Sequence, residues 1–222
     1  MKSVTERVYL TDFILACFAY CLFVGSDSIV KYLGSDYSIV QIIFVNSWFA
    51  FIPIVLYTQT LNGWRKLKKA NFTVHFFRAL TMALALFFGY TGFYRLPMVT
   101  MYSIVFLIPL LITLGSVFFL GEVVRWKRFT AILIGFIGAI ISINPFGTEY
   151  DNYIFLALFC PIFASASYLI VRKYGFKENL FSFLIYGKIL MLVLTGVFAL
   201  FIFKPVSLDH LMLNGACLLY TS

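Results

Sequence analysis

Charged side chains are scarce in this 222-residue chain. They make up 12% of it, with 17 Lys and Arg against 9 Asp and Glu and a net charge of +8. Soluble domains carry about 25% charged and roughly 45–50% apolar residues, whereas 62% of this chain is hydrophobic and its mean hydropathy is +0.96. So few charges cannot cover the surface of a soluble domain of this length. The composition excludes a water-soluble enzyme, a nucleic-acid-binding domain and a disordered chain, and predicts a protein of several membrane-spanning helices.

Residues that carry out catalysis or bind metals are equally scarce. The chain has two His and four Cys, and none of the Cys stands near a His or an acid at metal-ligand spacing. The apolar runs contain no paired acids of the kind that intramembrane hydrolases need, and no Gly-rich phosphate loop occurs. The sequence therefore predicts no catalytic residue, no metal site, no cofactor and no nucleotide-driven pump within this chain.

Long apolar runs take up most of the sequence. Each is close to the roughly 20 residues that cross the hydrocarbon core as a helix. They cover residues 10–32, 38–58, 75–96, 99–120, 129–145, 153–171 and 180–203. The predicted fold class is an all-α polytopic membrane protein of about seven transmembrane helices. We interpret the first run as a retained span, because Glu6 lies before it and no small-residue cleavage site follows Val24.

Lys and Arg are distributed unevenly between the two ends of the apolar runs. With the N-terminus in the cytoplasm, 12 of the 17 Lys and Arg fall in inner segments and 3 fall in outer segments. Positive residues favour the cytoplasmic side in short loops. The pattern predicts a multi-pass protein of the inner (plasma) membrane whose N-terminus is cytoplasmic.

An internal repeat is visible when the chain is shifted by 141 residues. Residues 16–34 then lie over residues 157–175, and six of the 19 positions are identical. A repeat unit of five helices is odd in number, so the second copy is expected to be inverted in the membrane, as in many secondary carriers. The repeat predicts a first five-helix repeat over 1–147 and a partial second repeat over 148–222, in which 208–219 begins an eighth helix. Since a complete second repeat needs five helices, we expect the native protein to continue beyond this sequence.

A series of residues between the third and fifth apolar runs carries a family resemblance. It consists of Arg78, Tyr94-Arg95-Leu96-Pro97, Phe106, Pro109, Gly121-Glu122, Gly135, Gly138 and Pro145. Together with Gly25-Ser26-Asp27 and Lys31 in the first run, the series resembles the EamA type of the drug/metabolite transporter superfamily. The resemblance implies ten helices in two inverted repeats, cytoplasmic termini and transport of small metabolites across the inner membrane. Asp27 stands where many members have Asn, and residues 98–102 are bulkier than the small residues usual there.

Asp27 and Lys188 are the ionisable residues that we expect at a substrate site. A charge inside a span costs a few kcal/mol, so each side chain is expected to face a wet cavity or a partner rather than lipid. The 141-residue shift lays Lys188 beside Asn46 of the second run. We predict that four substrate-binding residues from the paired runs line one central cavity: Asp27, Asn46, Tyr168 and Lys188. The alternatives are an Asp27–Lys31 pair or contact with water at the outer end, and for Lys188 a snorkelled or ion-paired side chain.

Three tyrosines and one arginine have both a structural and a functional interpretation. Tyr90, Tyr94 and Tyr102 are expected to form either an interfacial aromatic belt or an aromatic wall around a flat or cationic substrate. Of these, Tyr90 is predicted to contact substrate. Arg78 is expected to be structural, because it can reach the headgroups or pair with Glu122, which is then structural too.

Small residues and prolines are assigned structural roles. Pro97 marks a turn between runs, and Pro109 marks a kink within one, because proline removes a backbone hydrogen bond. Gly135 and Gly138 lie among other small residues and are expected to let helix backbones approach closely.

The function predicted from these features is secondary transport of small organic metabolites or drugs by alternating access. The expected partners are a small-molecule solute and the lipid bilayer, with no nucleic acid, and a homodimer is left open. One alternative is a membrane scaffold or assembly protein that does not transport. A seven-helix photoreceptor with a retinal Schiff base on Lys188 is disfavoured, because the predicted orientation is opposite and residues 75–96 contain no acid as counter-ion.

Overall fold

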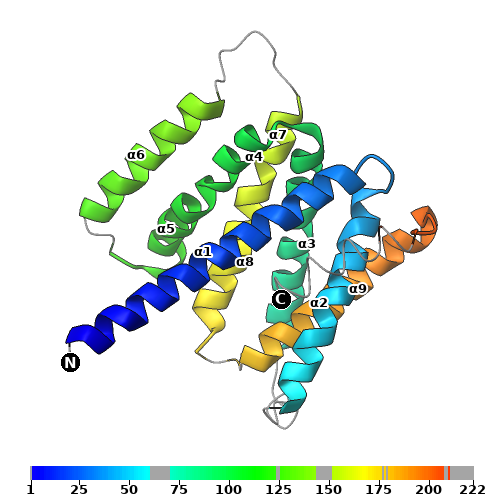
Figure 1. Cartoon of the computed structure of the whole chain (residues 1–222), viewed down its shortest axis with the longest axis horizontal. Coiled ribbons are helices and arrows are strands. Elements are labelled where there is room, and N and C mark those ends of the chain that lie inside the picture. The colour runs from blue at the N-terminus through cyan, green and yellow to red at the C-terminus, as the bar shows by residue number, and fades with distance from the viewer. Residues whose placement is uncertain are drawn as a thin grey trace.

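The computed structural model describes residues 2–60, 71–123, 126–143, 152–176, 178, 180–207 and 210. All regular structure in these ranges is helical (Figure 1). The helices are α1 (Lys2–Leu33), α2 (Ile39–Thr60), α3 (Phe72–Arg95), α4 (Met98–Val105), α5 (Leu107–Leu120), α6 (Trp126–Ile143), α7 (Tyr153–Ala157), α8 (Phe159–Tyr174) and α9 (Leu180–Ile202). The eighth helix predicted over 208–219 lies outside the described residues, apart from His210.

Six stretches of the described chain are long and apolar enough to cross a membrane. They are Asp12–Leu33, Ile39–Thr60, Phe72–Arg95, Met98–Leu120, Tyr153–Tyr174 and Phe181–Ile202. A shorter apolar stretch, Phe129–Ile141, lies within α6. These seven segments coincide with the seven apolar runs of the sequence, so the predicted class of all-α polytopic membrane protein is confirmed.

Two of the spans are divided by a kink. The first kink lies at Phe106, between α4 and α5, and the second lies at Leu158, between α7 and α8. Both residues keep helical φ and ψ and donate to the carbonyl four residues earlier. Each kink lies three residues before a proline, Pro109 or Pro161, which has no N–H to bond the preceding turn. Helix α2, in contrast, continues through Pro53.

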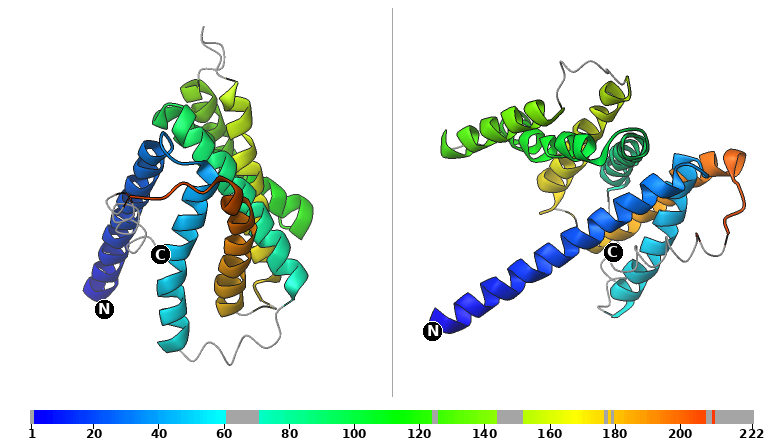
Figure 2. Two further views of the ribbon diagram at one scale, coloured as in Figure 1. Left: turned by 90° about the vertical axis from the view of Figure 1, so that its right-hand side faces the viewer. Right: turned by 45° about the horizontal axis from the view of Figure 1, so that its top comes forward.

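Helix α3 is the centre of the described structure. It packs against α1, α2, α7, α8 and α9, while α2 also packs along α9 and α5 along α8. A buried core joins α3 and α4 to α7 and α8, and it consists of Phe93, Leu96, Met101, Ile104, Ala157 and Cys160. In Figure 1, α1 crosses diagonally over the other helices and its N-terminal end projects beyond them, as the second view of Figure 2 also shows. Side chains that point from α3 can thus meet residues from both halves of the sequence.

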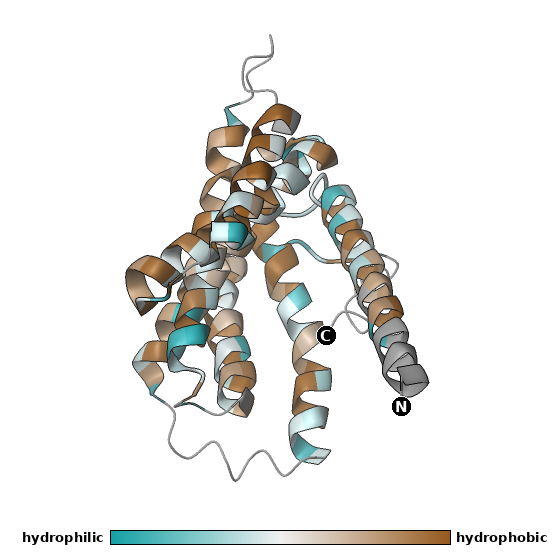
Figure 3. Cartoon of the chain, turned by 90° about the vertical axis from the view of Figure 1, so that its left-hand side faces the viewer, coloured by the Kyte–Doolittle hydropathy of each residue, from teal (hydrophilic) through white to brown (hydrophobic). Residues whose placement is uncertain are grey.

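The outer surfaces of the helices are apolar. Figure 3 shows hydrophobic colouring along most helices, with hydrophilic positions scattered among it. Large apolar side chains are highly exposed, among them Phe118 at 81% and Phe201 at 85%. A soluble protein rarely exposes apolar area on this scale, whereas a bilayer offers hydrocarbon to contact it. The surface therefore agrees with a chain whose helices lie in a membrane.

Helix α6 borders a groove along α4 and α5. Gly135 and Gly138 have no atom within 4 Å of the place where a Cβ would stand. Together with Pro109 and Ala139 they line an apolar groove of about 560 Å³, and α6 also packs against α4 and α5. The expected role of these two glycines in bringing helix backbones close together stays a prediction.

Helices α4 and α5 begin and end at residues suited to those positions. Pro97 occupies the N-cap of α4, where a missing N–H costs no helical hydrogen bond. Gly121 ends α5 in the left-handed conformation, with φ of 69°. There the N–H of Gly121 donates to the Val117 carbonyl at 3.2 Å, and the N–H of Glu122 donates to the Ser116 carbonyl at 3.3 Å. These bonds close the end of the helix.

We expect Gly121→Ala to destabilise the chain by about 1 kcal/mol, because a Cβ disfavours positive φ. For a chain of this size that corresponds to a fall of about 2–4 °C in the thermal unfolding midpoint. Gly135→Ala is the matched control, since α6 is regular there and open space surrounds the position. Scanning fluorimetry in detergent checks both variants, and equal midpoints for the two would contradict the helix-end assignment.

Candidate functional site

Asp27 is a buried carboxylate in the middle of the helical assembly. Its residue is 4% exposed, and the Tyr102 hydroxyl of α4 donates to its Oδ2 at 2.8 Å. A buried charge is costly unless it is hydrogen-bonded, and a bond to a carboxylate is among the stronger ones. The alternative Asp27–Lys31 pair is absent, because Lys31 Nζ donates to the Leu96 carbonyl at 2.8 Å.

A second polar pair extends this site toward α2. Asn46 is buried, and its Nδ2 donates to the Tyr90 hydroxyl of α3 at 3.2 Å. The Tyr90 ring also packs against the buried core that contains Val30, three residues after Asp27 on α1. Asn46 Oδ1 is buried and has no hydrogen-bond partner among the described residues. We call Asp27, Asn46, Tyr90 and Tyr102 the Asp27 cluster; it brings together side chains of α1, α2, α3 and α4.

The sequence analysis did not predict that Tyr102 bonds Asp27. Its position follows from Pro97, which starts α4, and from the burial of Met101 and Ile104 in the core on either side of it. Its ring packs edge-on against Phe93, with centroids 5.2 Å apart. The sequence held one signal for this contact: residues 98–102 are bulkier than the residues usual at these positions in the family that the chain resembles.

Arg78 lies near the N-terminal end of α3 and forms a hydrogen bond with α9. Its Nη1 donates to the Phe183 carbonyl at 2.7 Å, and its guanidinium carbon stands 5.5 Å from the centre of the Phe183 ring. A Cβ at Gly187 would clash with Nη1, so the glycine allows the guanidinium to approach the backbone of α9. Its Nε is buried and has no hydrogen-bond partner among the described residues.

Lys188 lines the same small cavity as Arg78, between α2, α3 and α9. The cavity has a volume of about 130 Å³, and both cationic residues are among its lining residues. Tyr168 of α8 is 51% exposed and lies within electrostatic range of Arg78. We call this place, with Arg78 and Lys188 on its wall, the Arg78–Lys188 cavity.

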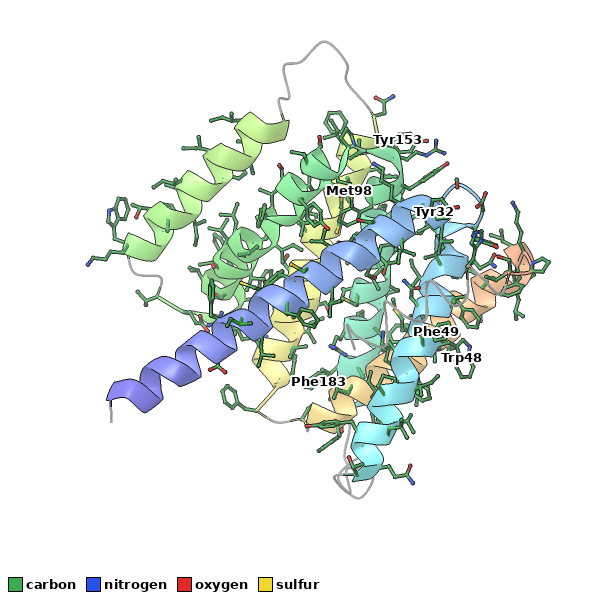
Figure 4. All side chains as sticks on the ribbon, in the orientation of Figure 1. Tyr32, Trp48, Phe49, Met98, Tyr153 and Phe183 are labelled. Atoms are coloured by element: carbon green, nitrogen blue, oxygen red, sulfur yellow. The ribbon has the colours of Figure 1, made fainter. Side chains whose placement is uncertain are left out.

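The predicted site residues thus fall into two groups. Asp27, Asn46 and Tyr90 come together, whereas Lys188 lies with Arg78, and Tyr168 is near Arg78. Arg78 and Tyr90 are 12 residues apart on α3, which is about 18 Å along a helix. In Figure 4, Met98 of α4 and Phe183 of α9 lie at well-separated places on the structure. A single cavity shared by Asp27 and Lys188 stays a prediction.

The predicted pairing of Arg78 with Glu122 is wrong. Glu122 Oε2 lies 2.7 Å from Arg172 Nη2, in a half-exposed ion pair that joins the end of α5 to the end of α8. The ends meet because α5 packs along α8. Arg78 instead uses the backbone carbonyl of Phe183.

His75 and Glu178 form another pair at the same end of the fold. His75 Nε2 lies 3.3 Å from Glu178 Oε2, and Glu178 Oε1 accepts a bond from the backbone N–H of Asn71 at 3.0 Å. The pair fixes the start of α3 to the segment that precedes α9. In the ranges described, no group of three or more His, Cys, Asp or Glu could hold a metal ion.

Comparison with known proteins adds a family to this geometry. The sequence model of the EamA-like transporter family matches residues 12–144. The chain is 30% identical to the S-adenosylmethionine uptake transporter of Rickettsia felis over 178 residues, which cover 77% of this chain and 58% of that one. The same figures hold for the protein of that name from Rickettsia bellii. Identity to the riboflavin transporter of Vibrio cholerae is 24% over 192 residues, covering 85% and 62% of the two chains. The chain therefore spans less than two thirds of the length of these relatives.

We expect Tyr102→Phe to lower stability, because it leaves the buried Asp27 carboxylate without its recorded hydrogen-bond donor. Bonds to charged groups contribute about 1.5–3 kcal/mol, so the unfolding midpoint is expected to fall by several degrees. Tyr94→Phe is the matched control. It also removes a tyrosine hydroxyl, but from a residue of α3 whose ring packs against Gly34. Thermal unfolding in lipid nanodiscs measures both. If the two substitutions act alike, the Asp27–Tyr102 bond has no special role.

Proposed function

Because the chain belongs to the EamA-like transporter family, we propose that it serves in carrying a small organic metabolite across a membrane by alternating access. The observation that supports this most is the Asp27 cluster, a buried carboxylate surrounded by two tyrosines and an amide inside candidate spans. An intramembrane acid is expensive and is retained where it binds a substrate, an ion or a proton. The relatives named as transporters support the same function.

We propose that the substrate is a cation-bearing metabolite with a flat ring, of the kind that S-adenosylmethionine represents. The Asp27 carboxylate would offset the positive charge of such a molecule, and the Tyr90 and Tyr102 rings would lie against the cation or the ring. Asn46 Oδ1, buried without a partner in the described chain, would accept a hydrogen bond from a substrate N–H. A buried acceptor of this kind is normally satisfied, so a bound ligand is a natural partner.

The kinked spans support alternating access. The kink at Phe106 lies four residues beyond Tyr102, whose hydroxyl donates to Asp27. The kink at Leu158 lies between Ala157 and Cys160, which pack in the buried core with Met101 and Ile104 on either side of Tyr102. Movement about these two kinks would therefore change the surroundings of Asp27.

We further propose that the chain crosses the inner membrane several times with its N-terminus in the cytoplasm. The support is the excess of Lys and Arg at one set of helix ends, 12 against 3. In this orientation the α2–α3 connection is cytoplasmic and the α6–α7 connection is outside.

Orientation is tested by labelling intact cells with a membrane-impermeant maleimide. We expect a Glu149→Cys variant to be labelled from outside and a Lys68→Cys variant to be labelled only after permeabilisation. The unsubstituted chain, which carries four Cys of its own, gives the background. Labelling of the Lys68→Cys variant in intact cells would reverse the proposed topology.

Substrate binding is tested with S-adenosylmethionine, called the sulfonium probe below, and with riboflavin as a flat probe without a cation. We expect Asp27→Asn to weaken binding of the sulfonium probe about 100-fold, because breaking a buried charge pair costs about 3 kcal/mol. The affinity of the Asp27→Asn variant for riboflavin should stay unchanged, because riboflavin carries no cation. Isothermal titration in nanodiscs gives the affinities, and uptake into proteoliposomes by the longest reading frame that contains this chain gives transport.

Asp12→Asn is the matched control for the Asp27 experiment. Asp12 lies on the same helix but is exposed, so its substitution should leave the affinity unchanged. Unaltered binding and uptake in Asp27→Asn would remove the carboxylate from the proposed site. A complete lack of sulfonium-probe binding by the unsubstituted protein would overturn the proposed substrate class.

A further inference from the structure

The Arg78–Lys188 cavity holds two cations whose charges are not balanced by a described acid. Both side chains line the cavity of about 130 Å³. The other residues of its wall are apolar, among them Ile54, Met82 and Leu86. Two like charges in such surroundings repel each other and lose hydration, unless an anion lies between them.

The buried and half-buried acids of the described chain are engaged elsewhere. Glu178 pairs with His75, one turn before Arg78, and also accepts the Asn71 N–H. Glu122 pairs with Arg172, and Asp27 binds the Tyr102 hydroxyl at the far end of α3. Among the described residues, no hydrogen bond or ion pair compensates the Lys188 ammonium group. The cavity is therefore an electropositive place with no counter-charge in the described chain.

Lys188 is too far along its helix to leave the charge in the headgroups. It lies eight residues beyond Leu180, the first residue of α9, which is about 12 Å along the helix. Its side chain is half-buried and turns toward α2 and α3 at the cavity. Snorkelling, which places a Lys head in water, does not account for this position.

Arg78 keeps one group free for a ligand in this cavity. Nη1 donates to the Phe183 carbonyl, and Nε is buried away from solvent without a partner in the described chain. The remaining donors are those of Nη2, which has no recorded hydrogen bond among the described residues, and a carboxylate accepts strongly from such a charged donor. The cavity of about 130 Å³ has room for several water molecules, which accommodates a carboxylate and its neighbouring carbon.

We propose that the Arg78–Lys188 cavity is a carboxylate-binding site, in which Arg78 Nη2 donates to the carboxylate and Lys188 neutralises its charge. The carboxylate belongs either to the transported metabolite, an assignment that rests on the proposed function, or to a free small carboxylate. The site lies about 18 Å along α3 from Tyr90. It is therefore a second position, distinct from the Asp27 cluster.

The first arm of the test uses acetate alone and does not depend on transport. The purified chain is placed in nanodiscs of zwitterionic lipid, and its unfolding midpoint is measured in sodium acetate and in sodium chloride of equal ionic strength. We expect acetate to raise the midpoint by about 3 °C. Lys188→Met should abolish the gain, while Lys188→Arg should keep most of it.

Lys127→Met is the matched control for the loss of one positive charge, because Lys127 is exposed on α6. It should retain the full acetate effect. An acetate effect that is absent from the unsubstituted chain, or equal in Lys188→Met, would overturn the proposal. Arg78→Gln is a second variant in which the effect should vanish, but it also removes the bond to Phe183, so Lys188→Met decides.

The second arm distinguishes the two sources of the carboxylate. One molecule of the sulfonium probe cannot reach both places at once, so this arm uses the Asp27→Asn variant, in which the Asp27 cluster no longer attracts the cation. It compares the affinity of the probe with that of its decarboxylated form, which keeps the cation and the ring. If the metabolite supplies the carboxylate, Asp27→Asn prefers the complete probe about 10-fold, and Asp27→Asn combined with Lys188→Met shows no preference. Equal affinities together with a positive acetate arm support a site for a free carboxylate. If neither probe binds the unsubstituted chain, the proposed substrate fails, and the acetate arm still decides on the carboxylate site.

Discussion

The cost of a charge inside an apolar helix bundle is the constraint on which the polar architecture of this chain depends. Where side chains and backbone have no water to bind, each polar group must find its partner within the protein. Asp27 obtains the Tyr102 hydroxyl, and Arg78 obtains the Phe183 carbonyl. These two bonds fix α1 against α4 and α3 against α9, so the groups proposed to bind ligands also position the helices.

Helix α3 connects the two polar places. It contacts helices from both halves of the sequence, and it carries Arg78 near its beginning and Tyr90 near its end. Between them, Ala79 and Ala85 are buried and closely packed, so the two polar places are separate in the described structure. The kinks before Pro109 and Pro161 lie in spans beside this helix.

Much of the fold could be predicted from the sequence because hydrophobicity alone decides which segments enter a membrane. The seven runs, the all-α class and the family resemblance are confirmed. The burial of Asp27 was accessible, because a charge in a span is expected to face a partner or a wet cavity rather than lipid. The hydrogen-bond partner of Arg78 could not be predicted, because every residue carries a backbone carbonyl. The open space at Gly135 was not predictable either, since small residues permit close packing without requiring it.

The central claim is that Asp27 is the place where a positively charged metabolite binds. It is tested most directly by a cryo-electron-microscopy structure of the longest reading frame that contains this chain, determined with the sulfonium probe bound. The account predicts density for the probe with its sulfonium within about 4–6 Å of the Asp27 carboxylate, the range of a direct charge interaction. Probe density elsewhere, with the Asp27–Tyr102 bond intact and the cluster empty, would contradict it.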